Sequence, residues 1–299
     1  MSHDIIGHGQ TRKFLHALAG GVELPHHAFL FSGPESVGKS LVAGEFSAAL
    51  LGIGRGHIDS NPDFMHIGPD MTKEGKEKEI PIDVVRGASA FLSRFPTEAS
   101  RRVLLVEEAD RMTDGAQNAL LKVFEEPNDT SVLILVTSRP GGVRETLRSR
   151  SFPVSFGLVP EAEIREGVQR SFDETARATV EPFFFSLGRP GIVFGALSDP
   201  ERFVSRRDAL RLMLTLRKAS ASERIALSER LAESVPETLR LLGWWVSGLR
   251  AMKYSESDPR QIRATYRLLE DIEETMRLIR TTNANVRLLL DRLFLVAVG

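Results

Sequence analysis

The chain has 299 residues, with 39 Lys and Arg against 40 Asp and Glu and a net charge of −1. A protein that holds DNA by itself usually carries a basic excess, so this balance indicates that any DNA contact is local or shared with partners. The absence of cysteine excludes disulfides and thiolate zinc sites. The N-terminus lacks the apolar segment of a signal peptide, and no apolar run reaches the roughly 18 residues of a membrane helix. We therefore expect a cytoplasmic protein without membrane contact.

The first part of the chain alternates helical and strand patterns. Residues 5–20 read as a glycine turn followed by a helix, 28–31 as a buried strand, and 39–51 as a second helix. Residues 52–80 contain several Gly and Pro and a run of mixed charge, which predicts an irregular, exposed connection.

The same alternation continues as far as about residue 155. Helices are expected at 82–95 and at 115–126, and all-apolar strands at 103–106 and 132–136. Strands that are apolar on both faces and alternate with helices are typical of a mostly parallel sheet covered on both sides. The fold class is therefore α/β in this part of the chain.

Beyond residue 155 the strand pattern fades. Residues 160–200 suggest a small helical unit, and residues 202–299 are almost wholly helical by pattern. Trp244 and Trp245 lie in an apolar helical stretch, where packing in a core is favoured over stacking on nucleic-acid bases.

A glycine-rich motif stands between the first strand and the second helix, and it satisfies G-x-x-x-x-G-K-[ST] in full. Its eight residues are Gly33, Pro34, Glu35, Ser36, Val37, Gly38, Lys39 and Ser40. Glycines let successive backbone N–H groups turn towards phosphate oxygens, and the following helix presents its positive end to the same anion. Lys39 is the candidate for the β- and γ-phosphates and Ser40 for Mg²⁺, which predicts ATP or ADP as the ligand.

An acidic pair follows the strand at 103–106. In a P-loop protein the first carboxylate at this place holds Mg²⁺ and the second activates the attacking water. Glu107 and Glu108 occupy the two positions, and Glu107 is one methylene longer than the usual Asp. We expect nucleotide binding with at most weak hydrolysis, and an exposed acidic turn is the simpler alternative.

Several further segments surround these motifs at matching spacings. They are 25–33, 60–64, 109–112, 118–127, 147–151 and 285–290. Together they resemble the clamp-loader subunits of bacterial DNA polymerase III, which are AAA+ P-loop proteins. The resemblance is strong in 25–155, where 118–127 (NALLKVFEEP) closely resembles the family's N-A-L-L-K-x-L-E-E-P, and it is thin in 156–280.

Within that family, three features resemble delta-prime subunits more than the tau/gamma motor. The chain ends at residue 299 without a long extension, Glu107 replaces the usual Asp, and Gly191 stands where a sensor-2 arginine would fall, with Arg189 two residues earlier. The cysteines of the zinc module common in both groups are absent, so we predict no zinc.

The resemblance implies three domains. They are an AAA+ nucleotide-binding domain at 1–157, a helical lid at 158–202 and an all-α collar for oligomerisation at 203–299. The implied partners are tau/gamma, delta, the sliding clamp and, through the complex, primed DNA.

The resemblance also implies roles for single residues. Arg150 would be an arginine finger that serves a neighbouring subunit's ATP site, and Thr137 or Ser138 would be the sensor-1 hydroxyl. A surface arginine and a capping hydroxyl are the alternatives. Two other functions remain open, a tau/gamma-type motor ATPase and a free-standing P-loop nucleotide kinase.

Overall fold

The computed structural model divides the chain into two compact units, Met1–Ser171 with Arg189–Gly191, and Phe172–Gly188 with Ile192–Gly299. Each unit is described by itself. The structure describes residues 5–21, 24–69, 79–125, 128–172, 188–198, 208–209, 211–213, 215–216, 218–252, 259–282 and 284–297.

The first unit is built on a five-stranded sheet in the order β2-β3-β4-β1-β5, in which all neighbouring strands are parallel. The strands are β1 (Ala28–Ser32), β2 (Phe64–Ile67), β3 (Arg102–Val106), β4 (Ser131–Thr137) and β5 (Phe152–Ser155). The three strands predicted from the sequence are present and form the centre of the sheet. The two edge strands, β2 and β5, are additional findings.

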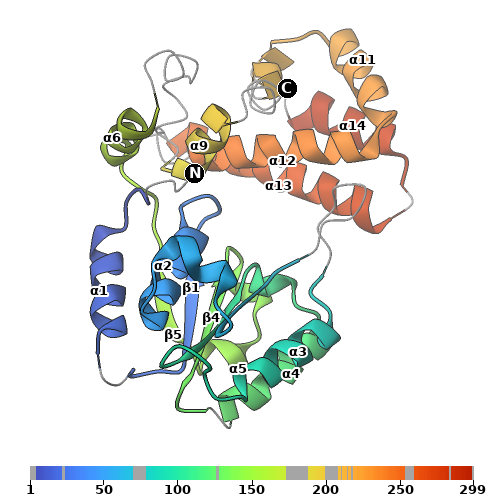
Figure 1. The fold of residues 1–299 in the computed structure, drawn as a ribbon. Helices are drawn as coiled ribbons and strands as arrows, with labels where there is room; N and C mark the ends of the chain where they lie inside the picture. The colour runs from blue at the N-terminus through green and yellow to red at the C-terminus, as the bar shows by residue number, and fades with distance from the viewer. Residues whose placement is uncertain are drawn as a thin grey trace. The chain divides into compact units, whose positions relative to one another are not determined.

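Helices cover both faces of this sheet (Figure 1). α1 (Gly9–Ala19) and α2 (Lys39–Leu51) pack on one face, and α3 (Ile82–Leu92), α4 (Asp114–Glu125) and α5 (Glu145–Arg148) pack on the other. Successive side chains of a strand point to opposite faces, so Phe29 and Phe31 pack towards α2 while Leu30 packs towards α3 and α4. The two-sided burial explains why the strands are apolar throughout.

The connection at 52–80 is more ordered than its composition predicts. It contains a 3-10 helix, η1 (Arg55–Ser60), and the edge strand β2, so the expectation of an irregular segment was wrong there. Of the charge run at 73–79, residues 73–78 lie outside the described residues. The helix expected at 82–95 ends at Leu92, because the chain then turns into a loop held by buried polar groups.

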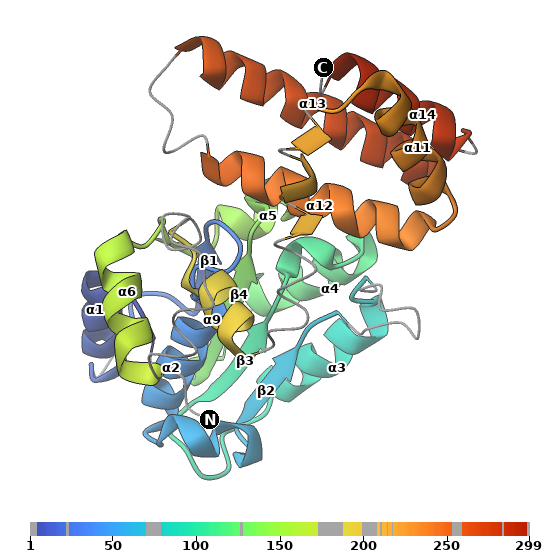
Figure 2. The ribbon, with the colours of Figure 1, turned by 90° about the horizontal axis from the view of Figure 1, so that it is seen from above.

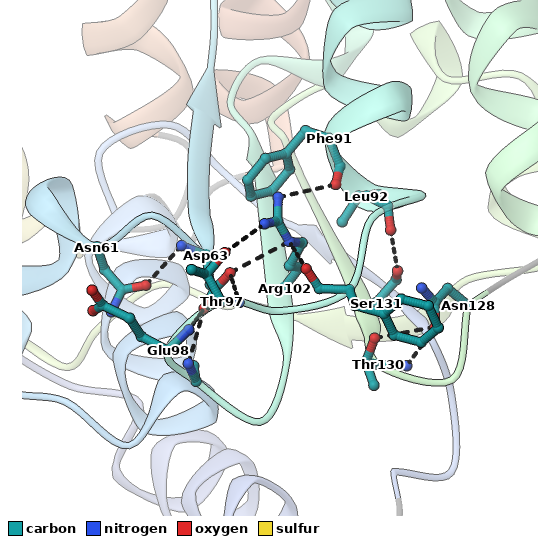
Figure 3. Close-up of polar contacts among 12 residues, drawn as sticks. Asn61, Asp63, Phe91, Leu92, Thr97, Glu98, Arg102, Asn128, Thr130 and Ser131 are labelled. Atoms are coloured by element: carbon teal, nitrogen blue, oxygen red, sulfur yellow. Dashed lines mark hydrogen bonds and ion pairs between the residues drawn. The ribbon is translucent and has the colours of Figure 1, made fainter.

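That loop is anchored on Asp63, whose carboxylate is fully buried (Figure 3). The carboxylate accepts backbone N–H bonds from Thr97, Glu98 and Ala99 at 2.7–2.9 Å. Arg102 lies 3.4 Å away, and its guanidinium donates to the carbonyl of Phe95 at 2.9 Å.

Burial by itself would raise the pKa of Asp63. The three backbone donors and the positive charge of Arg102 outweigh it, so the pKa is lowered and the carboxylate is charged at neutral pH. The ion pair therefore fixes both the end of α3 and the start of β3.

The second unit is helical, and its C-terminal part contains α11 (Ala221–Ala232), α12 (Val235–Met252), α13 (Pro259–Thr281) and α14 (Val286–Arg292), which continues into the π-helical η4 (Leu293–Ala297). α12 and α13 lie side by side (Figure 2). α6 (Glu161–Ser171) belongs to the first unit, whereas most of α9 (Pro190–Ser198) belongs to the second. The division into three domains stays a prediction.

Trp245 is the centre of the helical core. Its ring is fully buried, its Nε1 donates to the carbonyl of Ala209 at 2.6 Å, and it packs against Phe294 with ring centroids 5.7 Å apart. The expectation of core packing for this residue is confirmed. Among the helices described in either unit, none has the length and apolar character needed to cross a membrane.

Candidate nucleotide-binding site

The glycine-rich motif forms a loop that joins the carboxyl end of β1 to the first turn of α2. Gly33 has a φ of 155° and Gly38 a φ of 106°. A Cβ at Gly33 would lie 2.2 Å from the carbonyl oxygen of Phe156, whereas a Cβ at Gly38 would meet nothing within 4 Å. Gly33 is therefore required by close packing, and Gly38 by its backbone conformation, which leaves open space at the N-terminus of α2.

Lys39 is buried and points back over this loop. Its Nζ donates to the carbonyls of Gly33 and Pro34 at 2.8 and 2.6 Å and to the hydroxyl of Ser138 at 2.9 Å. Burial above all, and the charge of Arg189 as well, lower the pKa of Lys39 to about 8, although nearby carboxylates oppose the shift. When a nucleotide binds, its phosphate oxygens would take the place of the two carbonyls as hydrogen-bond acceptors for the ammonium.

The depressed pKa gives a pH prediction. Phosphate binding needs the charged ammonium, so nucleotide affinity should be constant below about pH 8 and fall about tenfold per pH unit above it. Titration of a fluorescent ADP analogue from about pH 7 to 9.5 measures this. A dissociation constant that stays flat over that range would mean that Lys39 keeps its proton in the free protein.

The acidic pair follows β3 as predicted, and its two carboxylates have different surroundings. Glu107 lies 3.5 Å from Nε2 of His66, and hydrogen bonds from His66 first and from Ser40 as well hold its pKa below the usual value. Glu108 has a φ of 47° and pairs with Arg111 at 2.6 Å. The ion pair with Arg111 neutralises Glu108, the candidate water-activating base, and no sequence pattern had indicated this pair.

Ser40 and Glu107 are brought together, as their proposed role requires. A hydroxyl and a carboxylate are oxygen ligands of the kind that Mg²⁺ prefers, and they adjoin the open space over the phosphate loop. The residues present therefore fit a magnesium–nucleotide complex. No cluster of three or more His, Asp or Glu is formed by the described residues, so phosphate oxygens and water would complete the coordination.

The two candidate sensor hydroxyls, Thr137 and Ser138, have different hydrogen-bond partners. Thr137 donates to the Asp110 carboxylate at 2.5 Å and accepts from the backbone N–H of Arg139. Ser138 contacts Lys39 instead. The contact geometry therefore favours Ser138 over Thr137 for a role at the phosphate.

The segment that replaces the usual sensor-2 motif packs directly on the phosphate loop. The backbone N–H of Gly191 donates to the carbonyl of Ser36 at 2.9 Å, and a Cβ at Gly191 would lie 3.0 Å from the same oxygen. A long side chain at position 191 would displace the loop. Arg189, two residues earlier, is buried and lowers the pKa of Lys39, so it is close enough to act on that site electrostatically.

His8, part of the segment expected to border an adenine pocket, also adjoins the loop. Its Nε2 lies 3.0 Å from the carbonyl of Val37, and its ring meets Phe156 edge-on with centroids 4.9 Å apart. Burial lowers the pKa of His8, which favours the neutral ring. This contact supports a place for the segment beside the nucleotide site.

Arg150 lies far from all of these residues. It follows α5 and precedes β5, and it borders a cavity of about 140 Å³ with Pro25 and His26, the residues that lead into β1. It is exposed and donates to the carbonyl of Thr146 at 3.2 Å. Arg150 is therefore at the amino edge of the parallel sheet and Lys39 at the carboxyl edge, about 16 Å away at the usual rise of a parallel strand.

A phosphate loop after β1, an acidic pair after β3, a polar hydroxyl after β4 and this strand order define a P-loop protein of the AAA+ type. Comparison with known proteins narrows the class. The family described as "DNA polymerase III, delta subunit" matches residues 11–159. The match covers 149 of the 299 residues, and over it the chain is similar to DNA polymerase III clamp-loader subunits, delta' subunits among them.

Individual relatives show the same similarity. The DNA polymerase III subunit delta' of Pseudomonas aeruginosa is 32% identical over 57% of this chain and 56% of its own length. The subunit delta' of Escherichia coli is 25% identical over 87% of this chain and 74% of its own. The first match thus spans about half of that relative.

Among solved structures, a DNA polymerase III gamma subunit-related protein from Thermotoga maritima has a TM-score of 0.54 at 19% identity, covering 96% of this chain and 98% of the other. This likeness shows the fold.

Proposed function

We propose that this chain is a stator-like component of a clamp loader, which works with tau/gamma-type and delta-type subunits to load a sliding clamp onto primed DNA. It would supply Arg150 to the ATP site of a neighbouring subunit. Its near-neutral charge suits a protein whose main contacts are with other proteins.

The position of Arg150 carries this proposal. The residue is exposed at the amino edge of the sheet, and its guanidinium donates to the Thr146 carbonyl at 3.2 Å. At about 16 Å from Lys39 it cannot contact a phosphate bound by its own loop. An exposed guanidinium there can instead stabilise the charge on a phosphoryl group held by another subunit.

The chain's own site is proposed to bind ATP or ADP with Mg²⁺ and to hydrolyse ATP weakly. Lys39 and the loop N–H groups would hold the phosphates, and Ser40 and Glu107 the metal, which would offset phosphate charge. Glu108 is paired with Arg111, so a carboxylate free to activate water is lacking there. Gly191 supplies no side chain to the γ-phosphate.

Removing the Lys39 ammonium tests whether clamp loading depends on nucleotide binding to this chain. Lys39→Ala is expected to weaken ADP binding to the isolated chain by 100-fold or more, on the order of 3 kcal/mol for a charged contact with phosphate, and to change clamp loading by the reconstituted complex less than about twofold. Calorimetry and a clamp-loading assay measure the two effects. The matched control is Lys13→Ala on the exposed side of α1.

A tau/gamma-type motor is the second candidate, favoured by the complete phosphate loop. Under that assignment, Lys39→Ala would abolish clamp loading and Arg150→Ala would be mild. A free-standing nucleotide kinase, which should be active alone, gains no support from the relatives.

A further inference from the structure

A histidine that no sequence motif singled out stands beside the proposed metal ligands. His66 is on the edge strand β2, opposite Leu105 of β3, and its Nε2 lies 3.5 Å from an oxygen of Glu107. Leu105 packs towards the α2 face of the sheet, so His66 is on the face from which Ser40 begins α2. His66, Glu107 and Ser40 therefore converge from β2, β3 and α2.

The spacing fits a shared metal ion. Two neighbouring ligands of an octahedral ion, each at about 2.1 Å from the metal, lie about 3 Å apart. The Nε2–carboxylate distance of 3.5 Å needs only a small adjustment to reach this separation. His66 and Glu107 are both half-exposed, so an ion that arrives with a nucleotide can reach them from solvent.

The backbone holds the two residues in register. The N–H of Glu107 donates to the carbonyl of Ile67, the neighbour of His66, at 2.9 Å. Gly68 follows, and a Cβ there would lie 3.6 Å from that of Glu107, so the chain passes the carboxylate closely without covering it. The pair is thus positioned by the β2–β3 ladder.

We propose that His66 is a nitrogen ligand of the divalent cation bound with the nucleotide, and that this site consequently prefers a first-row transition metal such as Mn²⁺, which accepts imidazole more readily, over Mg²⁺. Imidazole suits transition metals, whereas Mg²⁺ takes oxygen ligands almost exclusively. The inference rests on the proposed nucleotide site. The longer Glu107, in place of an aspartate, lets its carboxylate reach the ion beside the imidazole.

The experiment compares ADP binding in MnCl₂ and in MgCl₂ for the full chain, His66→Ala and the control His57→Ala. His57 is exposed on η1. His66→Ala is expected to weaken Mn²⁺–ADP binding by about tenfold or more, since losing even a group that supports a metal ligand has an effect of about this size, and to leave Mg²⁺–ADP binding within about twofold. His57→Ala should match the unaltered chain in both.

Pulsed EPR gives a direct readout. With ¹⁵N-histidine in the protein and unlabelled ADP, bound Mn²⁺ should show a ¹⁵N coupling that disappears in His66→Ala and persists in His57→Ala. Tight Mn²⁺–ADP binding without this coupling would overturn the histidine ligand and leave the nucleotide site standing. Failure to bind ADP with either metal would overturn both, while the role of Arg150 in a neighbouring site would be unaffected.

Discussion

Arg150→Ala should lower ATP turnover at the neighbouring site served by this residue by about 1,000-fold, the lower end of the effect of removing an arginine finger. Nucleotide binding to this chain should not change, because Arg150 lies at the opposite edge of the sheet from Lys39. The measurement is DNA-stimulated ATPase of the complex assembled with tau/gamma-type and delta-type subunits.

Two variants sharpen this test. Arg150→Lys keeps the charge but not the planar fork of donors, so most of the activity should still be lost. Arg148→Ala removes a neighbouring arginine that pairs with Glu145 in the same helix, and the ATPase should stay near its original level. Equal losses for Arg148→Ala and Arg150→Ala would indicate a general basic surface and would count against a finger.

Asp63→Ala should lower the free energy of unfolding of the first unit by about 3–5 kcal/mol, because it leaves Arg102 buried without its counter-charge and strips three backbone N–H groups of their acceptor. Urea denaturation measures the loss. Glu98→Ala is the control, since its exposed side chain is removed while its N–H stays. An effect below about 1 kcal/mol would show that the loop is held by other contacts.

The same carboxylate predicts a pH dependence. Its folded pKa lies below its unfolded value of about 3.9, so its stabilising contribution is complete above that value and is lost as the pH falls through the folded pKa. The unaltered chain should therefore lose stability more steeply in acid than Asp63→Ala. If the free energy of unfolding fell equally steeply with decreasing pH in the unaltered chain and in Asp63→Ala, this prediction would be contradicted.

Local patterns were sufficient for the central sheet and the phosphate loop. Each of β1, β3 and β4 is a short apolar run next to a motif, and the glycines and Lys39 are contiguous in sequence. β2 and β5 were missed because both are four-residue edge strands, and β5 contains Pro153, which weakens a strand pattern.

Contacts between residues that are far apart in the sequence could not be predicted from the sequence alone. Asp63 and Arg102 are far apart in the chain, and nothing in either segment indicates the partner. The choice between Thr137 and Ser138, however, was available from strand periodicity. Ile134 and Val136 face α2, which begins at the phosphate loop, so Ser138 continues that face and Thr137 points to the other.

The placement of Lys39 and Arg150 at opposite ends of β1 and β5 has a consequence for assembly symmetry. A subunit that offers one edge to its neighbour's phosphate site and presents its own site at the other edge has a direction. Contacts built this way join unlike surfaces, which favours head-to-tail interfaces over a twofold dimer. A member with a weak site of its own would then mark one defined position in such a ring, the position where the cycle of ATP sites is interrupted.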